Sequence, residues 1–218
     1  MKVTIITGSP HKDGTTALLT AEFIRGAQEV GWEIVRFDAA FEQIAPCLGC
    51  EHCRAENIPC VQKDGMERLI SMLLDSQAVA LVTPTYYFGF SSQLKRVIDR
   101  FYAYNHLLTG AKRVFLLAAA HGQGDWISKP LITHYQTLAR YLKWEDNGMV
   151  LAMGCGVRAD IEHTKFLQEA YELGCSLSKN SMMVTLQVLY SFITGNKDMT
   201  MYLRLNVFPK RFSMVKEK

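Results

Sequence analysis

The sequence lacks any long apolar run, and its charges are nearly balanced. The longest strongly apolar stretch, Val114 to Ala120, is far shorter than the roughly 18 residues that suggest a membrane span. The 218 residues contain 24 Lys plus Arg against 21 Asp plus Glu, a formal charge of +3, and the two signs alternate along the chain. These features argue against a membrane protein and against a dedicated nucleic-acid surface. We therefore expect a soluble protein with no membrane and no nucleic acid among its partners.

The chain is also poor in the residues that mark disordered or fibrous proteins. It has 6 prolines and 15 glycines, and 49% of its residues are hydrophobic, which is typical of a globular domain. At this size folding buries roughly 70% of the surface of the unfolded chain, so no metal or disulfide is needed to stabilise the core. The first apolar stretch, from Val3 to Gly8, is too short for the hydrophobic region of a signal peptide. We expect a cytoplasmic protein, whose thiols stay mostly reduced.

Short β-branched runs alternate with segments of helical periodicity along most of the chain. Strands are predicted at residues 3–7, 33–37, 78–82, 113–119 and 149–153. Helices are predicted at residues 15–30, 66–75, 91–104, 129–144 and 159–178. Such alternation predicts an α/β fold, a doubly wound parallel sheet of five strands in the flavodoxin-like order 2-1-3-4-5. Ligands of these sheets bind beyond the carboxyl ends of the strands, so the loops after strands 1, 3 and 4 are the places to look for chemistry.

Residues 179–218 continue after this five-unit domain, which we place at residues 1–178. They carry many apolar side chains at helical spacing and have no place in a five-stranded sandwich. Apolar patches of several hundred Å² are uncommon outside interaction sites. We expect a C-terminal extension that takes part in oligomerisation or packing, and a homodimer or homotetramer.

The loop after the first strand, residues 8–16, is rich in hydroxyl groups. A phosphate placed there would meet the unpaired N–H groups of the following helix, with the hydroxyls of Ser9, Thr15 and Thr16 as further donors. No G-x-G-x-x-G occurs in this loop, and no Lys follows Gly14 as in a nucleotide P-loop. The loop suits a phosphate monoester. The alternative is a plain turn in which Ser9 or Thr15 caps the helix.

The loop after the third strand places four aromatic residues within residues 86–90. Exposed rings favour a flat partner such as an isoalloxazine ring, which aromatic side chains can flank. The alternative is that the rings of Tyr86, Tyr87 and Phe88 pack in the core or in a subunit interface.

The two segments GSPHKDGTT and PTYYFGFSSQLKRVIDR together resemble the NADPH-dependent FMN reductase family of the flavodoxin-like fold. The resemblance covers about residues 1–155, and it implies that the first loop holds the FMN phosphate while the second lies along the flavin ring. His11 and Thr15 stand where that family often has Arg and Asn. A glycine-rich loop after the fourth strand matches the family in character only. The cofactor-binding residues that the resemblance implies are Ser9, His11, Gly14, Thr15, Thr16, Pro84, Thr85, Tyr86, Tyr87, Phe88, His121 and Gly122.

Four of the six cysteines lie within 14 residues of the irregular segment after strand 2, in the pattern C-x2-C-x2-C-x6-C. They are Cys47, Cys50, Cys53 and Cys60. Four thiolates this close can surround a [4Fe-4S] cluster, and three share the spacing of ferredoxin-type sites. The segment also resembles the compact cysteine motif of iron-sulfur flavoproteins, a branch of the same family in which a four-iron cluster lies near FMN. Zinc and metal-free thiols remain alternatives, and His52 can replace one cysteine as a ligand.

Taken together, these observations predict an FMN-dependent oxidoreductase, an iron-sulfur flavoprotein that passes electrons between a [4Fe-4S] cluster and FMN. No acid, base or nucleophile stands out as catalytic. NAD(P)H is a candidate electron donor, and the partners are expected to be small-molecule or protein donors and acceptors. One alternative is an NAD(P)H-dependent FMN or quinone reductase without a cluster. The other is a flavin-binding electron carrier that is not an enzyme.

Overall fold

The computed structural model describes residues 1–54 and 59–178. The predicted extension at residues 179–218 lies outside the described residues. Within the described part of the chain, none of the helices combines the length and the apolar character needed to cross a bilayer.

Five parallel strands form one sheet in the order β2-β1-β3-β4-β5, which confirms the predicted topology. The strands are β1 Lys2–Thr7, β2 Glu33–Asp38, β3 Ala78–Pro84, β4 Arg113–Ala120 and β5 Glu145–Met153. The helices are α1 Thr15–Glu29, α2 Met66–Leu74, α3 Ser92–Arg100, α4 Asn105–Leu108, α5 Asp125–Leu142, α6 Arg158–Ile161 and α7 Lys165–Cys175. Short 3-10 turns lie at His52–Arg54, Phe101–Tyr104 and Ser176–Ser178.

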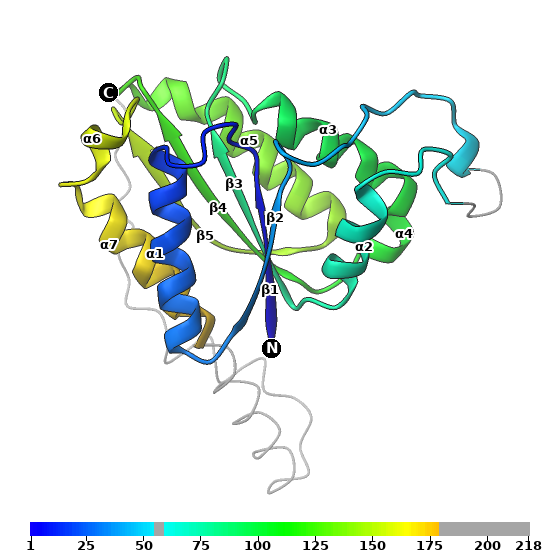
Figure 1. Ribbon diagram of the computed structural model, residues 1–218, viewed down its shortest axis with the longest axis horizontal. Coiled ribbons are helices and arrows are strands. Elements are labelled where there is room, and N and C mark those ends of the chain that lie inside the picture. The colour runs from blue at the N-terminus through cyan, green and yellow to red at the C-terminus, as the bar shows by residue number, and fades with distance from the viewer. Residues whose placement is uncertain (55–58, 179–218) are drawn as a thin grey trace, which may run out of the picture. The chain divides into compact units, whose positions relative to one another are not determined.

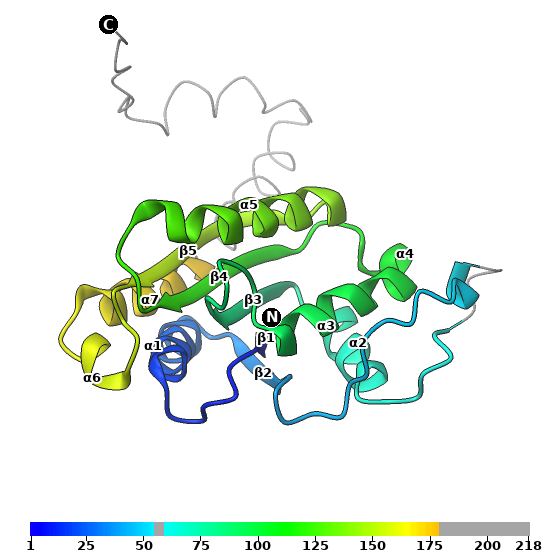
Figure 2. The same cartoon turned by 90° about the horizontal axis from the view of Figure 1, so that it is seen from above.

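The helices cover both faces of the sheet. Figure 2 shows α1, α6 and α7 on one face and α2, α3, α4 and α5 on the other. The side chains of β3 and β4 alternate between two hydrophobic clusters: Leu81 and Leu116 point to the α3 and α5 side, Ala80 and Leu117 to the α1 and α7 side. Burial on both faces explains why the central strands are continuous apolar runs.

Several element boundaries differ from the sequence-based expectation. The helix predicted at residues 91–104 ends at Arg100 and is followed by the 3-10 turn Phe101–Tyr104. Helix α5 begins at Asp125, four residues before the predicted start, and contains Pro130 in its second turn, where proline removes one backbone hydrogen bond. Strand β5 begins at Glu145 rather than at residue 149. The sequence pattern did not reveal its first half because residues 145–148 are polar. An irregularity between Asp146 and Met149 also shifts the register of β5 against β4. The helix predicted at residues 159–178 is divided into α6 and α7, and the Thr164 hydroxyl donates to the Ile161 carbonyl at the break.

Candidate functional site

The strands end at one edge of the sheet, toward the top of Figure 1, and the loops that follow β1, β3, β4 and β5 surround a cavity there. We call it the strand-end cavity. Its volume is about 720 Å³, within the 300–1,000 Å³ typical of small-molecule and cofactor sites. The residues that line it are Ser9, Pro10, His11, Lys12, Asp13, Gly14, Thr15, Pro84, Thr85, Tyr86, Ala119, Ala120, His121, Cys155, Gly156, Val157 and Arg158.

The start of α1 has unused hydrogen-bond donors. Gly14 is the N-cap residue, and no side chain bonds to the first turn of the helix. Ser9 instead bonds locally: its Oγ accepts from the His11 N–H at 3.1 Å. The cap by Ser9 or Thr15, considered as an alternative above, is therefore absent from the structure. Thr15 and Thr16 are buried, and among the described residues neither hydroxyl has a hydrogen-bond partner. An uncapped helix start beside two unbonded hydroxyls suits an anion.

Ser91 fixes the loop after β1 to the loop after β3. Its Oγ donates to the Gly8 carbonyl at 2.7 Å and accepts from the Leu94 N–H, so the same hydroxyl caps α3. Its backbone N–H donates to Thr83 Oγ1 at 2.9 Å. The loops approach so closely that a Cβ on Gly8 would lie 2.4 Å from Ser91 Oγ. Glycine at position 8 is required by this contact.

The aromatic loop forms a tight turn that presents its rings to solvent. The N–H and C=O groups of Tyr86 and Gly89 bond to each other, and both central residues, Tyr87 and Phe88, have positive φ values of 44° and 66°. Non-glycine residues rarely adopt this conformation, which costs free energy and is typical of functional sites. Tyr87 is 99% exposed, and the Phe88 ring packs on Trp126 with centroids 5.3 Å apart. Tyr86, Tyr87 and Phe88 are all exposed, so the alternative that they pack in the core is wrong, while their packing in a subunit interface stays a prediction. The neighbouring Phe90 is buried.

Most of the sequence-predicted cofactor residues lie together. Those that line the strand-end cavity are Ser9, His11, Gly14, Thr15, Pro84, Thr85, Tyr86 and His121. Thr16 lies in a smaller adjoining hollow that Ser9 and His11 also line. Tyr87 and Phe88 are outside the cavity lining, and Gly122 instead packs against Ile127, whose Cδ1 would lie 2.2 Å from a Cβ at position 122. Whether any of these residues binds a cofactor stays a prediction.

The sequence analysis missed the loop after β5. Residues 155–158 line the strand-end cavity, and Arg158 Nη1 donates to the Asp13 carbonyl at 3.3 Å. The loop is tied to its neighbours by backbone bonds, since the Cys155 N–H donates to the Ala120 carbonyl and the Gly154 N–H donates to the Gly122 carbonyl. Gly154 has φ +75°, a conformation that favours glycine. The two glycines that flank Cys155 at the end of a strand are the signal that points to this loop.

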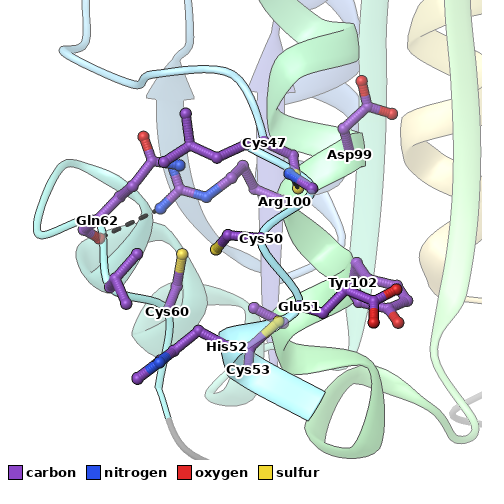
Figure 3. A pocket seen from close by; sticks show the side chains of 14 residues that line it. Cys47, Cys50, Glu51, His52, Cys53, Cys60, Gln62, Asp99, Arg100 and Tyr102 are labelled. Atoms are coloured by element: carbon purple, nitrogen blue, oxygen red, sulfur yellow. Dashed lines mark hydrogen bonds between the residues drawn. The ribbon is translucent and has the colours of Figure 1, made fainter.

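The cysteine segment forms a second cavity, which we call the cysteine cavity. Its volume is about 460 Å³, and all four cysteines of the motif line it together with His52, Arg100 and Tyr102 (Figure 3). Cys47 and Cys50 are exposed, and Cys53 and Cys60 are half-buried. Burial raises the pKa of the Cys53 thiol, and the negative charges of the other three cysteines raise it further. The structure therefore places the four thiols close enough together for the charges of the other three to act on Cys53.

Two local features suit a ligand-binding loop at these cysteines. The Gly49 N–H donates to Cys47 Sγ at 3.5 Å, and Gly49 and Glu51 both have positive φ, so the chain turns sharply between Cys47 and Cys53. As the side chains stand, the described residues contain no group of three or more His, Cys, Asp or Glu side chains placed to hold a single metal ion. An iron-sulfur cluster spaces its ligands farther apart than one ion does. The donor set, four thiols around one cavity, therefore fits a cluster.

Arg100 is the one fully buried cation of the cysteine cavity. Its side chain is 1% exposed and forms an ion pair with Asp64, Nη1 to Oδ2 at 2.8 Å. Burial opposes the charged state of Arg100, but the hydrogen bond to Asp64 and the negative charges of Asp64 and Cys60 outweigh it, so its pKa is raised. Burial also opposes ionisation of Asp64, yet the hydrogen bonds from Arg100, Met66 and Ala45 hold the pKa of that carboxyl below its usual value.

The fold and the strand-end cavity define a flavodoxin-like α/β protein with a cavity at the carboxyl ends of its strands, where ligands of such sheets bind. The chain belongs to the NADPH-dependent FMN reductase family, whose model matches residues 1–142.

Comparisons with individual proteins agree with this assignment. One iron-sulfur flavoprotein of Archaeoglobus fulgidus is 34% identical over 106 residues, which cover 49% of this chain and 48% of that protein. The chain thus spans about half the length of that relative. A second iron-sulfur flavoprotein of the same organism is 31% identical over 172 residues, which cover 77% of this chain and 83% of the relative. The fold also resembles an FMN-dependent NADH-azoreductase from Bacillus anthracis solved with FMN, with a TM-score of 0.62, 18% identity and coverage of 83% and 99% of the two chains.

Proposed function

We propose that this chain is an FMN-dependent oxidoreductase that binds FMN in the strand-end cavity and carries a [4Fe-4S] cluster in the cysteine cavity. The observation that carries the proposal is the presence of two separate cavities in a chain of this family, one beside an uncapped helix start and one lined by four cysteines. The names of the relatives, iron-sulfur flavoprotein, support the combination of the two groups.

The residues of the strand-end cavity fit FMN. The start of α1, with Ser9, His11, Thr15 and Thr16, supplies donors for one phosphate group. Pro84, Thr85 and the aromatic turn offer a surface and backbone groups for the flavin ring. The loop lacks a G-x-G-x-x-G fingerprint for a second phosphate, so FMN is favoured over FAD.

The cysteine cavity fits a four-iron cluster held by Cys47, Cys50, Cys53 and Cys60. The four thiols lie on one short segment, around a cavity large enough for such a group, beside a buried cation that compensates negative charge. Zinc or free thiols are the other possible states of these cysteines. When both groups are bound, the cluster supplies single electrons and FMN supplies one- or two-electron chemistry.

Helix α3 connects the two sites within the chain. It begins next to the aromatic turn, where Ser91 caps it, and its last residue, Arg100, lines the cysteine cavity. Nine helical residues span about 13 Å, so one rigid element sets the distance between the two cavities. What the chain itself contributes is position: one helix holds the flavin loop at one end and the cysteine segment at the other.

We propose NAD(P)H, another small molecule or a protein as electron donor and acceptor. A cluster-free NAD(P)H-dependent reductase is the second candidate, in which Cys47, Cys50, Cys53 and Cys60 remain thiols. Because the four motif cysteines form no disulfide, a reducing compartment such as the cytoplasm suits either candidate.

We also propose a homo-oligomer in which a second copy covers the exposed rims of the cavities. Tyr87 is 99% exposed, and Trp126 and Leu48 are each 65% exposed, although all three are apolar or aromatic. Light scattering on the full chain and on a form that ends at Ser178 tests this proposal. A monomeric full chain contradicts the oligomer, and an oligomeric truncated form contradicts a role of residues 179–218.

The central experiment is an absorbance spectrum of anaerobically purified protein with its flavin, iron and zinc measured. We expect about one FMN and about four iron atoms per chain, and FMN rather than FAD on denaturation. FMN without iron supports the cluster-free reductase, and turnover with NAD(P)H then separates it from an electron carrier. Stoichiometric zinc contradicts the cluster, and FAD contradicts the single phosphate site.

A further inference from the structure

The segment that carries the cysteines is tied to the domain by two arginines of one helix. Arg96 and Arg100 lie one turn apart on α3, and both donate to backbone carbonyls of the long connection between β2 and α2. Arg96 Nη2 donates to the carbonyls of Ala39 and Glu42, which lie upstream of the cysteines. Arg100 bonds residues that flank the four cysteines.

Arg100 bonds both ends of the cysteine segment at once. Its Nη1 donates to the Ala45 carbonyl at 2.9 Å, two residues before Cys47, and its Nη2 donates to the Gln62 carbonyl at 3.3 Å, two residues after Cys60. The dashed line in Figure 3 marks the second of these bonds. Since guanidinium is a planar fork of five donors, one side chain can hold two chain segments in a fixed relation.

Asp64 completes this closure. Its carboxylate accepts from both terminal nitrogens of Arg100 and also from the Ala45 N–H at 3.1 Å. Gln62 adds a further bond across the base of the loop, from its side-chain amide to the Pro46 carbonyl at 3.0 Å. The described residues of the segment contain no regular structure except one 3-10 turn. Its two ends are therefore held by these side-chain bonds and by one backbone bond, from the Gly65 N–H to the Gln43 carbonyl at 3.0 Å.

One donor of Arg100 is left over. Its Nε is buried and has no hydrogen-bond partner among the described residues, although a buried N–H without a partner is unfavourable. The side chain lines the cysteine cavity, where four thiolates and a bound cluster would together carry negative charge. Arg100 is therefore placed to compensate that charge as well as to fix the loop.

We infer that Arg100 is the positioning residue of the cysteine site: it clamps the two ends of the cysteine segment and places a positive charge at the wall of the cavity that would hold an anionic group. This inference rests on the proposed function for the identity of that group. It goes beyond it because neither the cysteine motif nor the family assigns a role to a residue of α3.

The test uses the full-length protein, reconstituted anaerobically, with four variants. Arg100→Met removes the clamp and the charge, Arg100→Lys keeps the charge without the fork, and Asp64→Asn removes the compensating carboxylate. Arg96→Met is the matched control, because Arg96 is on the same helix, also has a buried Nε without a partner among the described residues, and bonds the same connection outside the cysteine cavity. Iron per FMN and the midpoint potential of the cluster are measured for each.

We expect Arg100→Met to lose at least about half of the iron. In the cluster that remains, loss of a nearby positive charge disfavours the added electron. The ratio of reduced to oxidised cluster at fixed potential should fall roughly tenfold, which corresponds to about 59 mV for one electron. Arg100→Lys should keep the wild-type potential but lose part of the iron, and Asp64→Asn should shift the potential in the opposite direction. Arg96→Met should change neither quantity.

Wild-type iron content and potential in Arg100→Met would overturn the inference. So would an equal iron loss in Arg96→Met, because that result shows general destabilisation of the connection, and so would potential shifts of the same sign in Arg100→Met and Asp64→Asn. If Arg100→Met does not fold, Arg100→Lys and Asp64→Asn still test the fork and the charge separately.

Amide hydrogen exchange on the iron-free protein separates this inference from the proposed function. If wild-type protein takes up no iron, the cluster is wrong, but Arg100→Lys should still speed exchange in residues 45–54 and 59–64 while exchange in the sheet stays unchanged. Unchanged exchange in those residues contradicts the clamp whatever the iron content.

Discussion

The strand-end cavity and the cysteine cavity are held in place by different kinds of bonding. Around the strand-end cavity, loops leave buried parallel strands and are joined mainly by backbone bonds, such as that from the Thr85 N–H to the Ala119 carbonyl at 2.7 Å, with the Ser91 hydroxyl as an added link to the Gly8 carbonyl. Around the cysteine cavity, a largely irregular segment is fixed from outside by Arg100 and Asp64. The first site inherits its shape from the sheet, whereas the second depends on a few side chains of α3 and of the segment itself.

This comparison predicts which sites are sensitive to single substitutions. A site built on backbone bonds tolerates the loss of one side chain, because the sheet still positions its loops. A site fixed by one buried arginine and four ligands loses its function when one of those residues is removed. The four predictions below test that contrast, from the largest expected effect to the smallest.

The largest effect is expected at the cysteines. Serine at any one of Cys47, Cys50, Cys53 and Cys60 should lose most of the iron, because each thiolate supplies one of four ligands. FMN content and far-UV circular dichroism should stay unchanged, since serine is close to cysteine in size and none of the four thiols is fully buried. Iron analysis of anaerobically purified variants makes the measurement.

The other two cysteines are the controls for this experiment. Cys155 lines the strand-end cavity and Cys175 ends α7, so serine at either position should leave the iron content unchanged. Iron loss in Cys175→Ser, or full iron retention in the four motif variants, contradicts the assignment of the ligands.

The next effect is expected where the two flavin loops meet. Gly8→Ala places a Cβ 2.4 Å from Ser91 Oγ and 2.6 Å from Leu94 Cβ, so α3 must move away from the loop. The free energy of unfolding should fall by about 1–3 kcal/mol, as for overpacking in a core, and FMN affinity should fall with it. Gly89→Ala is the matched control because nothing lies within 4 Å of its Cβ position. Equal urea midpoints for the two variants would contradict the close approach.

A smaller effect is expected at the start of α1. Thr16→Ala should weaken FMN binding by about 1–3 kcal/mol, the loss of one charge-assisted hydrogen bond to phosphate. Thr20→Ala is the control: it is equally buried one turn further along, and its hydroxyl already bonds to the Thr16 carbonyl at 2.7 Å. Titration of apoprotein with FMN measures both. If Thr16→Ala binds FMN normally and Thr15→Ala binds it more weakly, the phosphate lies in the strand-end cavity, which Thr15 lines, and not in the adjoining hollow of Thr16.

The smallest effect is expected at the aromatic turn. Tyr87 is 99% exposed at φ +44°, so Tyr87→Gly relieves strain and loses only the edge contact of its ring with Phe88, at 6.4 Å between centroids. The net gain in stability should be about 0.5–1 kcal/mol, because the relief of left-handed strain exceeds the larger entropy loss of glycine. FMN affinity or oligomerisation should weaken in the same variant if the ring serves a ligand or a second copy. Thermal unfolding together with FMN titration separates the two effects, and a less stable Tyr87→Gly protein would show that the turn is not strained.

Regular periodicity made most of the fold predictable. Residues 78–82 of β3 and 114–120 of β4 are apolar throughout, so the type and order of these strands followed from pattern and connection rules alone. The first half of β5 was missed because residues 145–148 are polar and lie at the edge of the sheet, where pattern carries little information. The division between α6 and α7 depends on a local bond of Thr164, which periodicity does not reveal.

Only some residues of the candidate sites could be predicted from the sequence. Hydroxyls near a helix start, aromatics after a buried strand and closely spaced cysteines are contiguous in sequence, so their residues were named in advance. The loop at residues 155–158 joined the strand-end cavity only because β5 pairs with β4 and brings its carboxyl end to the same edge. Position along the chain gives no sign of that proximity.

The sequence by itself determined the order of the strands, the two loops beside α1 and α3, and the four clustered cysteines, because each is encoded in neighbouring residues. Only the tertiary structure decided that Arg100 reaches the cysteine segment. Its ion-pair partner Asp64 lies 36 residues before it in the chain. It also decided that Ser91 reaches Gly8 across 83 residues. Long-range hydrogen bonds form only after the sheet brings distant segments together, so no local pattern specifies them.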